Sequence, residues 1–210
     1  MESSANILFQ LLRAALGDET EVSLLDDVDW NRVIDWAFNQ GVAAMLVDGM
    51  QRSLELVPEP VDGRGESLER DLLESEELED LRYELFGEAL SCEEDYRKYE
   101  EAISSLARTY SEAGIEMMVL KGYGLSLNYP VPEHRPTGDI DVYLSDWKKG
   151  DEIIRQWGIA IDYSHHHHSV FSWRGFTVEN HYDIENRYAS RKGREAVEQL
   201  SGDVLVVGVT

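Results

Sequence analysis

The sequence predicts an α+β protein, with a helical region over residues 1–112 and a mixed β-sheet flanked by helices over residues 113–210. Apolar residues in the first region recur at intervals of three and four, which is the period of an amphipathic helix. From Ile115 onwards, short β-branched runs alternate with glycines and turn residues. Charge divides the chain at the same place, because residues 1–112 hold 28 acidic against 9 basic side chains and the remainder holds 14 against 10.

The first region is expected to form four helical segments. They cover residues 7–16, 30–37, 43–50 and 66–113. Gly17 supplies a stop for the first segment, and Asp29 is placed to cap the second. Two prolines and two glycines within residues 57–67 predict a loop.

The second region is expected to alternate strands with helices. Strands are predicted at residues 115–120, 140–144, 159–163 and 204–209, together with a hairpin over 171–182 that turns at 173–175. Helices are predicted at residues 123–129 and 147–157, and residues 187–200 form a helix or a long loop. Asp146 is placed to cap the second of these helices, and Gly158 to end it.

The composition excludes several classes of protein. A net charge of −23 opposes binding to phosphate backbones, so a long nucleic acid is a disfavoured partner. No stretch approaches about 20 consecutive apolar residues, and the N-terminus lacks the features of a signal peptide, so we expect a cytoplasmic protein without a membrane partner. Cys92 is the single cysteine, which excludes an internal disulfide. The acidic run of residues 69–101 is read as a solvated helix face, with a nucleic-acid mimic or interaction surface as the alternative.

Two aspartates enter the predicted strand at residues 140–144. Successive strand side chains point to opposite faces, so Asp139 and Asp141 share one face while Ile140 lies on the other. Paired carboxylates repel each other unless a cation lies between them, and hard oxygen ligands suit Mg²⁺ or Mn²⁺. Because that repulsion is unscreened without metal, Asp141→Asn is expected to stabilise the metal-free protein slightly.

An ordered set of short motifs surrounds these aspartates. It comprises Lys121-Gly122, Tyr129-Pro130, Arg135, Asp139-Ile140-Asp141 and Val178-Glu179-Asn180-His181. This set resembles the uncharacterised bacterial nucleotidyltransferase family of the polymerase-beta-like nucleotidyltransferase superfamily. The resemblance implies the mixed sheet of that superfamily and a metal-dependent transfer of a nucleoside monophosphate from an NTP to a hydroxyl group.

The resemblance also assigns roles to residues. It implies that Asp139, Asp141 and Glu179 are the catalytic metal ligands, with Mg²⁺ or Mn²⁺ as cofactor. It implies that the nucleotide is bound by Lys121, Gly122, Tyr123, Arg135 and His181.

Alternatives stay open at several of these positions. Gly122 taken alone is more often an ordinary tight turn than a phosphate-binding one. Tyr123 stands where many nucleotidyltransferases have a phosphate-binding serine, and Arg135 could equally pair with a nearby acid. Asp183 and Glu185 are rivals of Glu179, with Asp183 as the fallback.

Four consecutive histidines, His165 to His168, precede the predicted hairpin. In a strand His166 and His168 would share a face, so a metal site built from them is possible, although solvent-facing or phosphate-contacting histidines are the favoured reading. The resemblance places a strand histidine close to His168.

A nucleotidyltransferase is therefore the expected enzyme, acting on a protein or small-molecule acceptor. The alternative is a non-catalytic interaction or antitoxin-like protein that retains the fold. A P-loop and a kinase HRD or DFG set are absent from the sequence, which disfavours a hydrolase or kinase of antibiotics. Since the resembled family usually continues into a further helical region, the chain could also be a shortened form.

Overall fold

A computed structural model describes residues 2–18, 28–56 and 79–183 of the chain. By their contacts the residues form two compact units, which are described separately. Unit 1 comprises Met1–Arg97 with Ser126–Pro136, and unit 2 comprises Lys98–Leu125 with Thr137–Thr210. The two units divide within one helix, α5 (Glu79–Glu112), whose last residue is number 112. The domain boundary expected at residue 112 stays a prediction.

Unit 1 is helical. In its described part the helices are α1 (Glu2–Ala15), α2 (Trp30–Asn39), α3 (Ala43–Leu56) and the first part of α5, with the short 3₁₀ helix η2 (Pro132–His134). The predicted cap of α2 is present, because the Asp29 side chain accepts a hydrogen bond from the backbone amide of Arg32. Helix α1 crosses α3 closely at Gly49, where any Cβ atom would overlap the backbone of Leu11. The predicted helices of this region are confirmed, from residue 79 onwards in the last case.

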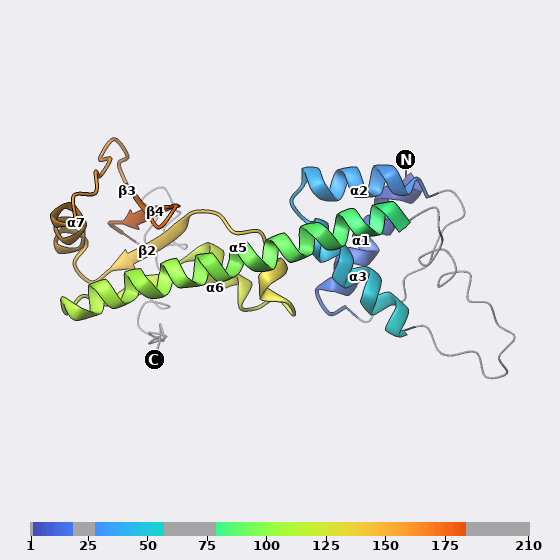
Figure 1. Ribbon diagram of the computed structural model, residues 1–210, viewed down its shortest axis with the longest axis horizontal. Helices are drawn as coiled ribbons and strands as arrows, with labels where there is room; N and C mark the ends of the chain where they lie inside the picture. The colour runs from blue at the N-terminus through green and yellow to red at the C-terminus, as the bar shows by residue number, and fades with distance from the viewer. Residues whose placement is uncertain (1, 19–27, 57–78, 184–210) are drawn as a thin grey trace, which may run out of the picture. The chain divides into compact units, whose positions relative to one another are not determined.

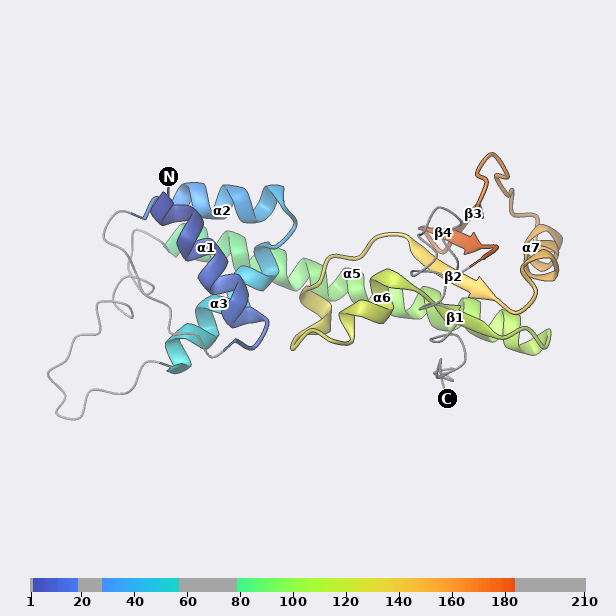
Figure 2. The same cartoon turned by 180° about the vertical axis from the view of Figure 1, so that it is seen from behind.

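Unit 2 contains a four-stranded mixed sheet in the order β1-β2-β4-β3 (Figures 1 and 2). Its strands are β1 (Met117–Val119), β2 (Ile140–Leu144), β3 (His168–Trp173) and β4 (Phe176–His181). Strand β2 pairs antiparallel with β1 and parallel with β4, and β3 pairs antiparallel with β4. The predicted α+β architecture is confirmed.

One face of this sheet packs into the core of unit 2. Ile140, Val142 and Leu144 of β2 are at most 1% exposed, as the strand period predicts. The second half of α5 runs along the sheet (Figures 1 and 2) and contributes a buried stripe at helical spacing. Its members are Tyr99, Ala102, Ile103, Leu106 and Tyr110.

Helix α7 (Trp147–Gln156) follows β2 directly, and its predicted cap is present because Asp146 accepts a hydrogen bond from the Lys149 amide. Gly150 lets α7 approach the sheet, since a Cβ there would overlap the side chain of Leu144. The predicted hairpin is also confirmed. Arg174 and Gly175 at its tip have φ of 50° and 92°, and two positive φ values in a row suit a tight two-residue turn.

Two predicted elements differ from the structure. Residues 159–163 form no strand; within them Asp162 makes an isolated bridge to Val170 of the edge strand β3. Helix α6 covers Lys121–Ser126 rather than residues 123–129. Tyr129 lies outside the helix, as expected of a residue that precedes a proline and is therefore disfavoured in the helical conformation.

Other predictions lie outside the described residues. They are the loop at 57–67, the helix start at 66–78, the element at 187–200, the strand at 204–209 and Glu185. Among the helices that the structure describes, none is long and apolar enough to cross a membrane.

Candidate active site on the exposed face of the sheet

The central feature of the candidate site is the pairing of β2 with β4. In this parallel pair Asp141 lies in register with Glu179. Both side chains lie on the face opposite the buried Ile140 and Val178. Asp141 is only 7% exposed, whereas Asp139 precedes β2 and is exposed. The backbone carbonyl of Asp139 accepts a hydrogen bond from the Tyr99 hydroxyl at 2.7 Å, which anchors the start of the strand to α5.

Two basic side chains meet the Asp141 carboxylate at the same oxygen. Lys121 Nζ donates to Asp141 Oδ1 at 2.7 Å, and His181 Nε2 lies 2.8 Å from the same atom. Burial by itself raises the pKa of Asp141, but the hydrogen bonds from Lys121 and His181 outweigh it and hold this pKa below its ordinary value. Asp141 is therefore a well-stabilised carboxylate anion.

Lys121 adopts an uncommon backbone conformation to make this contact. Its φ is 41°, in the left-handed region that non-glycine residues seldom occupy. The residue lies at the junction between β1 and α6, and its side chain remains 60% exposed. Backbone strain of this kind persists only where surrounding structure maintains it, and it concentrates at functional sites.

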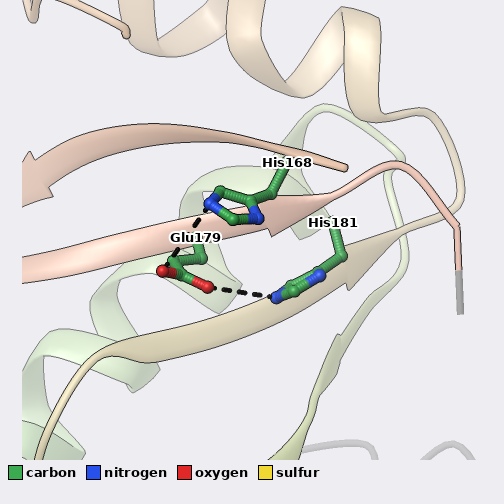
Figure 3. A group of neighbouring side chains, drawn as sticks. All are labelled: His168, Glu179 and His181. Carbon is green, nitrogen blue, oxygen red and sulfur yellow. Dashed lines mark ion pairs between the residues drawn. The ribbon is translucent and has the colours of Figure 1, made fainter. Parts of the chain in front are cut away.

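A second cluster adjoins Asp141 and consists of His168, Glu179 and His181 (Figure 3). His168 Nε2 lies 3.7 Å from Glu179 Oε1, and His181 Nε2 lies 3.4 Å from Glu179 Oε2. One potential ligand atom from each residue lies within 4.8 Å of the other two. All three residues are partly buried, and burial lowers the pKa of His168, partly offset by the Glu179 charge.

The hairpin brings this cluster together. His168 is the first residue of β3 and His181 the last of β4, and the two are direct partners in the antiparallel register. Glu179 is two residues before His181 and therefore shares its face. Outside the strand, the His165 ring stacks on His168 with centroids 4.7 Å apart. His166 lies outside β3 and is exposed, so the predicted sharing of a strand face by His166 and His168 is wrong.

A buried polar network lies behind the cluster, on the core side of the sheet. Asp151 of α7 is 1% exposed, and its Oδ1 accepts hydrogen bonds from Ser169 Oγ at 2.9 Å and Asn180 Nδ2 at 2.8 Å. Asn180 lies between Glu179 and His181 in β4, so the network fixes the strand that carries them. Sequence reasoning missed Asp151, although it lies three residues before the buried Ile154 and thus on the inward face of its helix.

The other sequence-predicted site residues have different surroundings. Tyr123 donates its hydroxyl proton to Glu100 Oε1 at 3.0 Å, and Gly122 lies beside it in α6. Arg135 belongs to unit 1, where its guanidinium donates to the backbone carbonyl of Pro136 at 3.3 Å. Asp183, the fallback for Glu179, lies beyond the end of β4 and is exposed. The structure thus brings Lys121, Asp141, Glu179 and His181 together and adds His168 to them.

Comparison with known proteins gives one match. The sequence model of a family described as uncharacterised nucleotidyltransferase matches residues 26–206, which is most of the chain. Neither the curated proteins nor the solved structures include a match to it.

Proposed function

The chain belongs to the family of uncharacterised nucleotidyltransferases, and on that premise we propose that it transfers a nucleoside monophosphate from an NTP to a hydroxyl group of an acceptor with the help of a divalent metal. In this reaction a bond forms between the acceptor oxygen and the α-phosphorus, the bond to the leaving pyrophosphate breaks, and the hydroxyl proton is released. The observation that carries the proposal is the register of Asp141 with Glu179 on adjacent parallel strands.

The proposed metal ligands are Asp139, Asp141 and Glu179. Their donor set fits Mg²⁺ or Mn²⁺, because carboxylate oxygens are the ligands these cations prefer. The Asp141 carboxylate also accepts a hydrogen bond from Lys121 Nζ and lies 2.8 Å from His181 Nε2, so it is an ionised group that attracts cations. When bound, metal ions in such sites align the attacking hydroxyl and neutralise charge on the pyrophosphate.

The nucleotide is proposed to contact Lys121, Gly122, Tyr123, Arg135 and His181. The support differs among them. Lys121 is the best supported, since its ammonium group lies at the Asp141 carboxylate and its largely exposed side chain can turn towards a phosphate. His181 contacts Asp141 as well. Arg135 stays in the proposal on the sequence resemblance alone.

The acceptor is proposed to be a protein or a small molecule. A chain of net charge −23 repels the phosphate backbone of a long nucleic acid, and its charge offers no sequence-independent attraction to one.

A non-catalytic interaction protein is the second candidate, and one observation favours it. Lys121 and His181 together satisfy Asp141 Oδ1 within the protein itself. A carboxylate neutralised in this way can persist for structural reasons without a metal.

A binding and transfer assay tests the proposal. Each of the four α-labelled NTPs is offered with Mg²⁺ or Mn²⁺ to the wild type, to Asp139→Ala and to Asp183→Ala, in the presence of cell extract as acceptor. We expect labelling by the wild type and by Asp183→Ala, and none by Asp139→Ala. If all three proteins neither bind nor transfer any NTP, the interaction protein replaces the enzyme. Labelling lost in Asp183→Ala as well as in Asp139→Ala would move the third carboxylate from Glu179 to Asp183.

A further inference from the structure

We propose that His168, Glu179 and His181 form a binding site for a first-row transition-metal dication such as Zn²⁺ or Co²⁺. These residues supply two imidazole nitrogens and a carboxylate from neighbouring strands (Figure 3). A role of this metal in catalysis rests on the proposed function. The proposal adds to that function the class of metal that His168, Glu179 and His181 select.

The distances between the ligand atoms are close to those that a metal requires. Bonds of about 2.0–2.1 Å in a tetrahedral shell place neighbouring ligand atoms about 3.4 Å apart. Glu179 Oε2 is 3.4 Å from His181 Nε2, and Glu179 Oε1 is 3.7 Å from His168 Nε2. One potential ligand atom from each residue lies within 4.8 Å of the other two, so side-chain movement of about 1 Å brings three donors to the separations of a tetrahedral shell.

The backbone favours this arrangement over a chance approach of three side chains. His168 and His181 are direct partners in the β3–β4 ladder, and Glu179 shares their face through the two-residue strand period. On the core side, Asp151 holds Ser169 and Asn180, which are the sequence neighbours of these ligands. The site is thus built on two strands that are fixed from behind.

The donor chemistry selects the metal. Imidazole nitrogen suits Zn²⁺, Co²⁺ and other later transition metals, whereas Mg²⁺ prefers oxygen alone. Asp141 Oδ1 lies 2.8 Å from His181 Nε2, which is a hydrogen-bond contact, so metal binding at Nε2 has to replace this contact. Asp141 then lies close enough to supply a fourth donor.

The three remaining histidines of the run complicate a direct test. His165, His166 and His167 are exposed and could bind transition metals by themselves. A background protein with His165→Gln, His166→Gln and His167→Gln removes that binding. Of the six histidines in the chain it retains His134, His168 and His181. His134 belongs to unit 1 and serves as an internal control.

The experiment follows the imidazole NMR signals of the full-length background protein during titration with Zn²⁺, and in parallel with Co²⁺ and Mg²⁺. We expect one equivalent of Zn²⁺ or Co²⁺ to shift the His168 and His181 signals strongly and to leave His134 unchanged, while Mg²⁺ at the same concentration, which prefers carboxylate oxygens, shifts them less. Unchanged His168 and His181 signals at excess Zn²⁺, or an equal response to Mg²⁺, would overturn the proposal. No ligand is mutated in this measurement, so its outcome does not depend on the folding of a ligand variant.

Variants then assign the ligands. Glu179→Gln and His181→Gln in the background protein should each weaken Zn²⁺ binding at least 10-fold, since even residues that only orient a ligand contribute about 10–100-fold. Retained affinity in both folded variants would contradict the site.

The metal measurement is independent of catalysis. Zn²⁺ binding without nucleotide transfer would support the transition-metal site and contradict the proposed function. Nucleotide transfer with Mg²⁺ but without Zn²⁺ binding would support the proposed function and contradict the transition-metal site.

Discussion

Asp141 and Glu179 lie directly opposite each other on the parallel strands β2 and β4, although 37 residues separate them in the chain. Neighbouring strands are about 4.8 Å apart, so this register brings two carboxylates of the same face next to each other. Lys121 and His181 balance the charge of Asp141, and His168 and His181 border Glu179. The predictions below test the parts of this arrangement and the packing that holds it.

Replacing Asp141 by Asn should abolish metal-dependent transfer and should also destabilise the metal-free protein at pH 7. The structure reverses the expectation of a slight stabilisation, because Lys121 and His181 already screen the carboxylate. Hydrogen bonds to charged groups contribute about 1.5–3 kcal/mol, and the exposure of Lys121 reduces the expected loss to about 1–2 kcal/mol. Urea denaturation of both proteins measures the difference.

The difference in stability between wild type and Asp141→Asn should depend on pH, because the pKa of Asp141 is lowered in the folded protein. A depressed folded-state pKa contributes stability above the unfolded pKa of about 3.9, and the contribution disappears as the pH falls through the folded-state value. The difference in unfolding free energy between wild type and Asp141→Asn should therefore narrow as the pH falls below about 3.9. A variant as stable as the wild type at pH 7 would contradict the role of the two basic partners.

Asp151→Ala should destabilise the protein by about 2–4 kcal/mol. Ser169 Oγ and Asn180 Nδ2 both donate to Asp151 Oδ1, and each loses a buried acceptor in the variant. Glu152→Ala is the matched control. The Glu152 side chain is the neighbour of Asp151 but is exposed, so its removal should change the free energy of unfolding by no more than about 0.5 kcal/mol. Equal unfolding midpoints in urea for the two variants would show that the buried network does not support the sheet.

Gly150→Ala and Gly87→Ala should have opposite effects, although both replace a glycine inside a helix. A Cβ at Gly150 overlaps the Leu144 side chain and approaches the Tyr110 ring, so overpacking should cost at least about 1 kcal/mol. A Cβ at Gly87 meets nothing within 4 Å, so the higher helix propensity of alanine should stabilise α5 by about 1 kcal/mol. Thermal melting of both variants gives the comparison, and a stabilised Gly150→Ala would contradict the close packing of α7.

A buried histidine in unit 1 should make stability depend on pH. His134 Nδ1 lies 2.8 Å from Asp48 Oδ1, and its Nε2 lies 3.5 Å from Glu93 Oε1. The hydrogen bond with Asp48 and, after it, the charges of Asp48 and Glu93 raise the pKa of His134 against the opposing effect of burial. The raised pKa means that the folded protein binds the proton more tightly than the unfolded chain.

The stabilisation that protonated His134 contributes is complete below the pKa of about 6.5 of a histidine in the unfolded chain. It is lost as the pH rises through the pKa of His134 in the folded protein. His134→Gln should therefore be less stable than the wild type by about 1–3 kcal/mol near pH 5.5, and this gap should narrow at alkaline pH. His166→Gln, which replaces an exposed histidine outside this contact, is the matched control. Urea denaturation between pH 5.5 and 9 measures both, and a gap that stays constant across this range would exclude the linkage.

The sequence determined the local features of this protein. The helices of unit 1 follow from the apolar period, and Asp29 and Asp146 cap their helices because a cap involves residues only three apart. The hairpin follows from its turn, and the alternation of Val178 with Glu179 from the strand period. The resemblance to a nucleotidyltransferase family rested on short motifs in order, and the family match confirms it.

The tertiary structure decided which of these elements meet. No local pattern states that β4 pairs with β2 in the register of Asp141 with Glu179, that Lys121 bonds Asp141, or that His168 joins Glu179 and His181. The same holds for residues 159–163, whose strand-like pattern formed no strand. Strand pairing and register depend on which faces the whole unit can bury together, and a window of a few residues does not contain that information.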